Sequence, residues 1–122
     1  MSKRILLIED TEDNRQILRD LLTAAGYDIF EATDGATGVT MAAELQPDLI
    51  LMDIQLPVID GYEATRRIKA DPSTQSIPVI AVTSYALAGD ELKTREAGCD
   101  GYIAKPYSPR HLLEKVREIL AR

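Results

Sequence analysis

Residues 48–53, DLILMD, indicate the fold of this 122-residue chain more clearly than any other stretch. Four consecutive apolar residues lie between two aspartates, and a short apolar run without alternation is typical of a strand buried on both faces. Apolar runs at 5–8, 79–82 and 102–104 predict three more strands, and alternation at 27–32 predicts a strand at a sheet edge. Because a buried sheet must be covered by other elements, we expect helices on both of its faces.

Apolar residues at helical spacing separate these strands along the chain. The first helix is predicted from residue 14 to residue 25, with one buried face formed by Ile17, Leu18, Leu21, Leu22 and Ala25. Four more helices are predicted at 36–45, 62–70, 87–97 and 109–121. Five strands that alternate with five helices predict an α/β fold with a doubly wound, five-stranded parallel sheet.

Length, charge and cysteine content limit the classes of function. A chain of 122 residues fits one compact domain. Its net charge of -6, from 20 acidic and 14 basic residues, argues against binding to nucleic acid or to a membrane surface. No apolar run approaches a membrane span, and the N-terminal run is too short for a secretory signal. A single cysteine forms no internal disulfide, so we expect a cytoplasmic protein.

Charged and polar side chains follow the predicted strands at the points where those strands end. These side chains are Glu9 and Asp10, Asp53, Thr83, and Lys105. Ligands of open parallel α/β sheets bind beyond the carboxyl ends of the strands, so we expect three carboxylates, a hydroxyl and an ammonium group to meet there. Three neighbouring carboxylates require a cation, and their oxygen ligands suit Mg²⁺. Thr33 and Asp34, which follow the edge strand, are expected to lie aside.

Asp53 is the carboxylate best placed to act as a nucleophile, because it ends a central strand. Glu9 and Asp10 are adjacent and suit a metal pair. A carboxylate nucleophile that attacks phosphorus needs positive charge on the phosphoryl oxygens, which Mg²⁺ and Lys105 would supply. Thr83 would donate a hydrogen bond to the same oxygens.

Three other functions fit the sequence less well than a phosphorylation switch does. A phosphatase with an aspartate nucleophile would carry a second aspartate at position 55 as general acid, where this chain has Gln55. A nucleotide- or flavin-binding module would need a glycine-rich loop after the first strand, where this chain reads EDTED at 9–13. A purely structural adaptor would not need the clustered carboxylates. The pattern therefore favours a switch over an enzyme that turns over substrate.

Four segments of the chain resemble the receiver domain of two-component response regulators. They are IED at 8–10, LILMDIQLP at 49–57 followed by Asp60-Gly61, PVIAVT at 78–83, and GCDGYIAKP at 98–106. The resemblance covers essentially the whole chain. Within the family the sequence is most similar to DivK-like single-domain regulators, and the receivers of hybrid histidine kinases look almost as similar.

The resemblance implies a flavodoxin-like (βα)5 sheet in the order 2-1-3-4-5, within one receiver domain over residues 1–122 and with no output domain. It implies that Asp53 accepts a phosphoryl group and that Lys105 pairs first with Asp53 and then with that group. Glu9, Asp10 and Asp53 would hold Mg²⁺ together with the backbone carbonyl of Gln55. The family also has a cis peptide bond between Lys105 and Pro106.

Switching and tuning residues follow from the same resemblance. Thr83 would move toward the phosphoryl group, and Tyr102 would turn inward behind it. Gln55 and Tyr85 stand at positions that vary in the family and affect the lifetime of the phosphoryl group. The chain would catalyse its own phosphorylation and slow hydrolysis, without being an enzyme in the usual sense.

The implied partners are a histidine kinase or phosphotransfer protein upstream and a protein target downstream. We expect partner choice near Asn14, Arg15, Leu18, Tyr107 and Ser108. The helix at 87–97, with its thin apolar stripe, is typical of a mobile or partner-binding element. We expect a monomer or weak dimer. The resemblance to DivK-like regulators implies a role in cell-cycle or polarity control. The alternatives are the receiver portion of a hybrid histidine kinase and a receiver-shaped adaptor without phosphotransfer.

Overall fold

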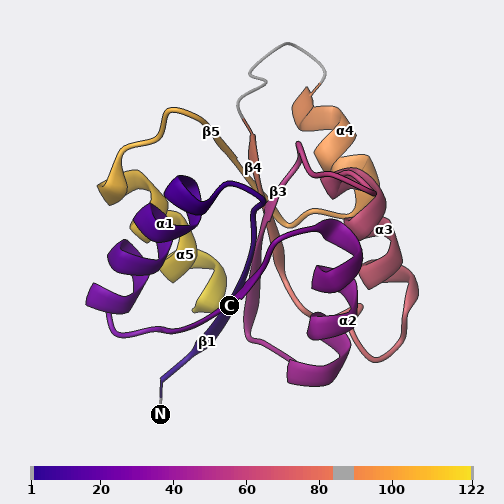
Figure 1. The fold of residues 1–122 in the computed structure, drawn as a ribbon, viewed down its shortest axis with the longest axis horizontal. Helices are drawn as coiled ribbons and strands as arrows, with labels where there is room; N and C mark the ends of the chain where they lie inside the picture. Colours follow the sequence, from indigo (N-terminus) through magenta and orange to yellow (C-terminus); the bar gives the residue numbers. More distant parts are fainter. Residues whose placement is uncertain (1, 84–89, 122) are drawn as a thin grey trace.

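The computed structural model describes residues 2–83 and 90–121 and has the predicted alternation of strands and helices. The elements are β1 (Arg4–Ile8), α1 (Glu12–Ala24), β2 (Asp28–Ala32), α2 (Gly35–Leu45), β3 (Leu49–Asp53), α3 (Gly61–Ala70), β4 (Val79–Thr83), α4 (Asp90–Ala97), β5 (Gly101–Ala104) and α5 (Pro109–Leu120). All neighbouring strands are parallel, and their order is β2-β1-β3-β4-β5. Figure 1 shows helices on both sides of this sheet. The predicted fold class and strand order are confirmed.

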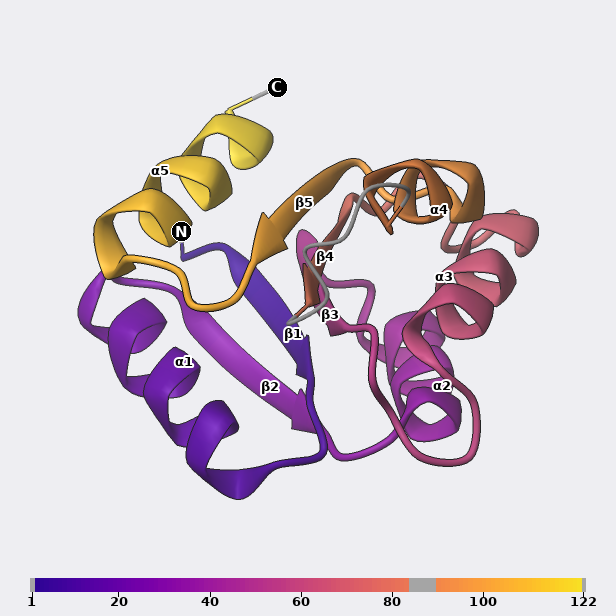
Figure 2. The same cartoon turned by 90° about the horizontal axis from the view of Figure 1, so that it is seen from above.

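The sheet lies between two layers of helices. Figure 2 shows α1 and α5 on one face of the sheet and α2, α3 and α4 on the other. Successive side chains of a strand point to opposite faces, so β1 supplies Ile5 and Leu7 to the core under α1 and α5, and Leu6 and Ile8 to the other core. Both faces of β1 and β3 are therefore buried, which explains why these strands are continuously apolar.

The predicted buried face of α1 differs from the structure at two residues. Leu18 and Leu22 of α1 are buried as expected, but Ile17 is 56% exposed, so its assignment to the buried face was wrong. Ile17 precedes Leu18 by one residue and is therefore rotated by about 100° from the centre of the buried stripe. Ala25 was also wrongly assigned to this face, because it is the C-cap of α1 and exposed.

The α4 helix is held weakly in its described part. Leu92 is 55% exposed and Ala97 is buried, while Leu87 of the predicted stripe lies outside the described residues. This agrees with the expected thin anchoring of the helix. Among the described residues, every helix is too short or too polar to span a lipid bilayer.

Capping residues mark where the chain turns from the sheet into helices. Asp34 caps α2 by accepting a hydrogen bond from the Thr37 amide at 2.7 Å, and Asp60 caps α3 through the Glu63 amide at 2.9 Å. Ser108 caps α5, which begins at Pro109. The Lys105–Pro106 bond is cis, as the family resemblance implied. Because the strands are parallel, the segments between each strand and the helix that follows it lie at the same edge of the sheet.

Candidate functional site

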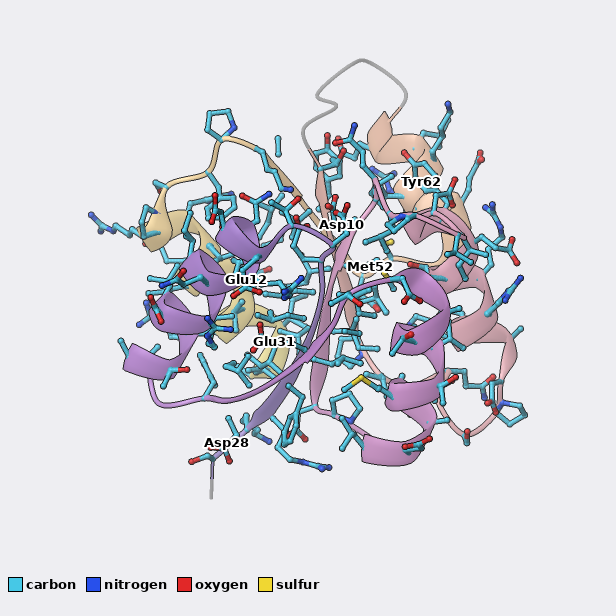
Figure 3. All side chains as sticks on the ribbon, viewed as in Figure 1. Asp10, Glu12, Asp28, Glu31, Met52 and Tyr62 are labelled. Carbon is cyan, nitrogen blue, oxygen red and sulfur yellow. The ribbon has the colours of Figure 1, made fainter. Side chains whose placement is uncertain are left out.

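An acidic cluster lies at the carboxyl ends of β1 and β3. Glu9 and Asp10 directly follow β1, and Asp53 is the last residue of β3. One carboxylate oxygen of each lies within 4.8 Å of the others. Glu9 and Asp53 are buried, whereas Asp10 is exposed at this end of the sheet (Figure 3). Carboxylate oxygens at this spacing, with one ligand open to solvent, form a donor set that fits a hard divalent cation such as Mg²⁺.

Lys105 provides the positive charge beside this cluster. Its ammonium nitrogen is 3.7 Å from Oε2 of Glu9 and 3.7 Å from Oδ2 of Asp53. The backbone amide of Lys105 donates to the Thr83 carbonyl at 2.7 Å, which continues the pairing of β4 with β5. The sheet thus brings together a cation and two carboxylates that lie far apart in the sequence.

The two buried carboxyl groups have pKa values that are shifted in opposite directions. Burial, the hydrogen bond with Glu9 and the negative charge of Glu9 raise the pKa of Asp53 to about 7, although Lys105 and the Gln55 amide act in the opposite direction. Burial alone would raise the pKa of Glu9, but hydrogen bonds from Asp53 and Asn14 and the charge of Lys105 outweigh it and lower that pKa. Without a cation, Asp53 therefore keeps its proton to a higher pH than Glu9 does.

Hydrogen bonds from the surrounding backbone and side chains orient the two carboxylates. The Asn14 amide group donates to Oε1 of Glu9 at 3.0 Å, and the Thr11 backbone amide donates to the same oxygen at 3.4 Å. The Gln55 backbone amide donates to Oδ1 of Asp53 at 3.1 Å. Asn14 is one of the residues expected to select the partner protein, and its contact with Glu9 is not among the predictions from sequence. Its position in the first turn of the helix that follows Glu9 was the signal for such a contact.

Thr83 and Tyr102 lie on the strands next to the cluster. Asp53 pairs in register with Val82, so Thr83 stands one residue beyond it at the buried end of β4. Tyr102 lies on the edge strand β5, where it pairs with Ala81 of β4, and it is half-buried. Gln55 is exposed in the loop after β3, and Tyr85 lies outside the described residues.

Three polar residues take no part in the acidic cluster, and Asp34 is the one expected to lie aside. Asp34 is engaged in capping α2. The Cys99 sulfur lies 3.8 Å from the Thr65 hydroxyl, and burial raises the pKa of its thiol to about 11. This pKa agrees with a packed thiol rather than a reactive one. His111 is exposed on α5.

An apolar groove of about 610 Å³ lies beside Lys105. It is lined by Asn14, Ile17, Leu18, Lys105, Pro106, Tyr107 and Pro109. The exposed Ile17 therefore belongs to a continuous apolar surface between α1 and the loop before α5. This surface borders the acidic cluster through Lys105.

Comparison with known proteins agrees with this geometry. The family model of the response regulator receiver domain matches residues 5–117. The polar-differentiation response regulator DivK of Brucella ovis is 43% identical over 120 residues, which are 98% of each chain.

Two solved structures extend the comparison to the fold. The receiver domain of sensor histidine kinase PA1611 from Pseudomonas aeruginosa, solved with a magnesium ion coordinated in its active site cleft, is 36% identical with a TM-score of 0.93 over 100% of both chains. A CheY-like response regulator receiver domain protein from Methanospirillum hungatei is 33% identical with a TM-score of 0.89, over 99% of this chain and 95% of that one. The chain belongs to the response regulator receiver domain family and is a DivK-like receiver of two-component signalling.

Proposed function

We propose that this receiver is a phosphorylation switch in which Asp53 accepts a phosphoryl group from the phosphohistidine of a histidine kinase or phosphotransfer protein. The observation that carries the proposal is the buried Asp53 carboxyl between Glu9 and the Lys105 ammonium group. A carboxylate oxygen of Asp53 attacks phosphorus, a P–O bond forms, the P–N bond breaks, and the imidazole leaves with the bonding electrons and takes up a proton. Water later attacks phosphorus, which releases inorganic phosphate and restores the carboxylate.

We further propose that Glu9, Asp10 and Asp53, with the backbone carbonyl of Gln55, hold Mg²⁺. The close approach of the three carboxylates and the raised pKa of Asp53 support this, because a cation relieves their mutual repulsion and displaces the proton. When bound, Mg²⁺ supplies positive charge for the oxygens of the transferring phosphoryl group. The protein holds the carboxylates that bind it in place through Asn14 and the backbone amides of Thr11 and Gln55.

Lys105 and Thr83 are the proposed ligands of the phosphoryl oxygens. Lys105 would exchange its contact with Asp53 for one with the phosphoryl group, and the Thr83 hydroxyl would donate a hydrogen bond. Because Thr83 ends β4 beside β5, its movement would change the space available to Tyr102. We propose that this local change alters the surface around α4, β5 and α5, where the weakly held α4 supports such a response.

The apolar groove beside Lys105 is the proposed docking surface for the phosphodonor protein. Its exposed Ile17, with Pro106 and Tyr107, offers apolar contact area next to the entrance of the acidic site. A partner bound there would bring its phosphohistidine to Asp53. Substitution of Ile17 should therefore slow phosphorylation by the kinase but not by a small phosphodonor.

The output of the switch is proposed to be altered binding to a downstream protein. The similarity to DivK, a polar-differentiation regulator, supports a role in cell polarity or the cell cycle. The acidic net charge of -6 supports a protein partner rather than nucleic acid or a membrane surface. The single cysteine supports action in the cytoplasm. We also propose that the chain acts as one receiver domain, in the form of a monomer or weak dimer.

A receiver attached to a sensor kinase is the second candidate. The similarity to the PA1611 receiver domain over 100% of both chains favours it. In both cases the chemistry at Asp53 is the same, so the two candidates differ in what the phosphoryl group controls.

Gln55 and Tyr85 are proposed to set the lifetime of the phosphoryl group. The exposed Gln55 side chain, two residues after Asp53, would obstruct the approach of water to phosphorus. Gln55→Ala and Tyr85→Ala should each shorten the dephosphorylation half-life measured by loss of mass. A half-life no shorter than that of the wild type would contradict this role.

Intact mass after incubation with acetyl phosphate tests the proposed chemistry. The wild type should gain one phosphoryl group with Mg²⁺ and none without it, and Asp53→Asn should gain none. Asp34→Asn is the matched control, because it makes the same exchange at a carboxylate outside the acidic cluster and asparagine still caps a helix. No gain in the wild type, or an equal gain in Asp53→Asn, would overturn the proposal.

A further inference from the structure

The Arg15 side chain binds the turn that carries two of the proposed metal ligands. One terminal guanidinium nitrogen, Nη1, donates to the backbone carbonyls of Glu9 at 3.0 Å and of Asp10 at 3.2 Å. The other, Nη2, is paired with Glu12, and Nε lies 3.3 Å from Oε1 of Glu31. All three nitrogens are therefore engaged, and only 11% of the side chain is exposed. We had expected Arg15 to contact a partner protein, but its contacts lie within the molecule.

Glu31 ties this arginine to the sheet. It lies on β2, in register with Leu7 of β1, so its backbone position is set by strand pairing. Both of its carboxylate oxygens also accept hydrogen bonds from Arg19, at 2.8 and 2.9 Å. Figure 3 shows Glu12 and Glu31 on the side of the molecule where α1 lies, below Asp10 at the end of the sheet. The result is a connected path from the sheet, through Arg15, to the Glu9–Asp10 backbone.

Charge alone does not explain an arginine at this place. A cation near the N-terminus of α1 opposes the helix dipole. It also lies close to a site that must attract a divalent cation. By contrast, a planar fork that donates to two carbonyls and a carboxylate at once has a clear geometric use, because it holds the turn in one conformation.

We propose that Arg15 is a positioning residue of the metal site, which acts by holding the β1–α1 turn so that the Glu9 and Asp10 carboxylates converge with Asp53. Glu31 is its anchor on the sheet. The inference rests on the proposed function, because it assigns Arg15 a part in Mg²⁺ binding at the same site. Groups that orient metal ligands from outside the first coordination sphere typically change metal affinity by about 10-fold or more.

The electrostatic and positioning roles of Arg15 predict opposite results. Removing a nearby positive charge should tighten binding of Mg²⁺ if charge dominates. If Arg15 positions the turn, Arg15→Ala should raise the Mg²⁺ dissociation constant by about 10-fold. Arg15→Lys should raise it as well, because an ammonium group keeps the charge but cannot span the two carbonyls and Glu31.

Mg²⁺ titrations followed by backbone amide chemical shifts would measure these constants. Arg19→Ala is the matched control: it removes the same charge from the same helix, but Arg19 contacts Glu31 and Glu12 rather than the turn. We expect its dissociation constant to stay unchanged or fall. Equal or tighter Mg²⁺ binding in Arg15→Ala, with a wild-type circular dichroism spectrum, would overturn the inference.

A double-substitution cycle tests the path through Glu31. Introduced alone, Glu31→Gln should raise the Mg²⁺ dissociation constant. Added to Arg15→Ala, it should leave that constant unchanged. An equal effect in both backgrounds would indicate long-range charge and contradict the path.

A metal-free measurement separates this inference from the proposed function. Without Mg²⁺, amide hydrogen exchange at Asp10 and Thr11 should be faster in Arg15→Ala than in the wild type, with the α3 amides unchanged. If the wild type fails to bind Mg²⁺, the proposed function fails, and the exchange rates still decide whether Arg15 holds the turn. Unchanged exchange at both amides would contradict its positioning role.

Discussion

The backbone of Gly61 lies directly against the carbonyl group of Asp53. A Cβ atom at Gly61 would stand 2.3 Å from the Asp53 carbonyl oxygen and 2.7 Å from the α-carbon of Ile54. The Gly61 amide also donates to the Ile54 carbonyl at 2.9 Å. The N-terminus of α3 thus closes onto the end of the strand that carries the proposed phosphoacceptor, and only glycine permits this approach.

Gly61→Ala should therefore displace the end of β3 as well as destabilise the fold. We expect the free energy of unfolding to fall by about 1–3 kcal/mol, since the added methyl group meets backbone rather than a flexible side chain. Phosphorylation by acetyl phosphate should slow in the same variant. Urea unfolding and the rate of mass gain measure the two effects.

Gly26→Ala is the control for a loss of stability without a change at the site. Gly26 has a φ of 96° and no atom within 4 Å of a Cβ position, so alanine would add backbone strain far from Asp53. It should be destabilised by about 1 kcal/mol and be phosphorylated at the wild-type rate. A wild-type rate in Gly61→Ala would show that the close approach has no bearing on the site.

The raised pKa of Asp53 predicts how stability changes with pH in the absence of metal. Between the ordinary carboxyl pKa and about 7, the folded state holds a proton on Asp53 that the unfolded state has lost. The free energy of unfolding should therefore decrease as pH rises from 5 to 8, by about 1–3 kcal/mol. The lowered pKa of Glu9 adds little slope above about pH 5.5, because Glu9 is then mostly ionised in both states.

Urea unfolding in EDTA at several pH values measures this slope. Asp53→Asn should remove most of it, because asparagine does not titrate, and should be more stable than the wild type at pH 8. The matched Asp34→Asn variant should keep the slope. A wild-type slope in Asp53→Asn would assign the titration to another group.

Lys105→Ala separates phosphoryl transfer from metal binding. Loss of the ammonium group should slow phosphorylation by about 10²–10³-fold, as removal of one group that stabilises transition-state charge does in other enzymes. Mg²⁺ should bind at least as tightly, because a cation 3.7 Å from two of the carboxylates has been removed. Lys3→Ala, at the opposite end of β1, should change neither quantity. Weaker Mg²⁺ binding in Lys105→Ala would mean that Lys105 organises the metal site.

Val58 occupies a backbone conformation that its side chain disfavours. Its φ is 72°, and it is 83% exposed in the loop between β3 and α3. A β-branched residue is costly in this left-handed region, whereas asparagine tolerates it. Val58→Asn should raise the free energy of unfolding by about 0.5–1 kcal/mol, and Val58→Ile, which is also β-branched, should not. Thermal and urea unfolding would measure the stability of both variants. If Val58→Asn were no more stable than the wild type, the proposed backbone strain at Val58 would be contradicted.

Local patterns in the sequence determined most of the architecture. The apolar run before Asp53 predicts a strand buried on both faces, because every residue of such a strand meets a layer of helices. The same regularity places Glu9, Asp53 and Lys105 at strand ends, and parallel strands bring those ends to one edge. The motifs at 8–10, 49–57, 78–83 and 98–106 are enough to indicate a receiver domain without any knowledge of contacts.

Only the tertiary structure decided which side chains meet and how charge is distributed among them. Helical periodicity assigned Ile17 to the core, but α1 packs on the sheet through Leu18 and Leu22, which leaves Ile17 exposed in the groove. The raised pKa of Asp53 and the lowered pKa of Glu9 depend on burial and on hydrogen bonds that form only when β1, β3 and α1 pack together. The path from Glu31 through Arg15 to the Glu9–Asp10 turn likewise joins separate elements. Backbone periodicity is a local property, whereas ion pairs and burial arise only when distant segments pack together.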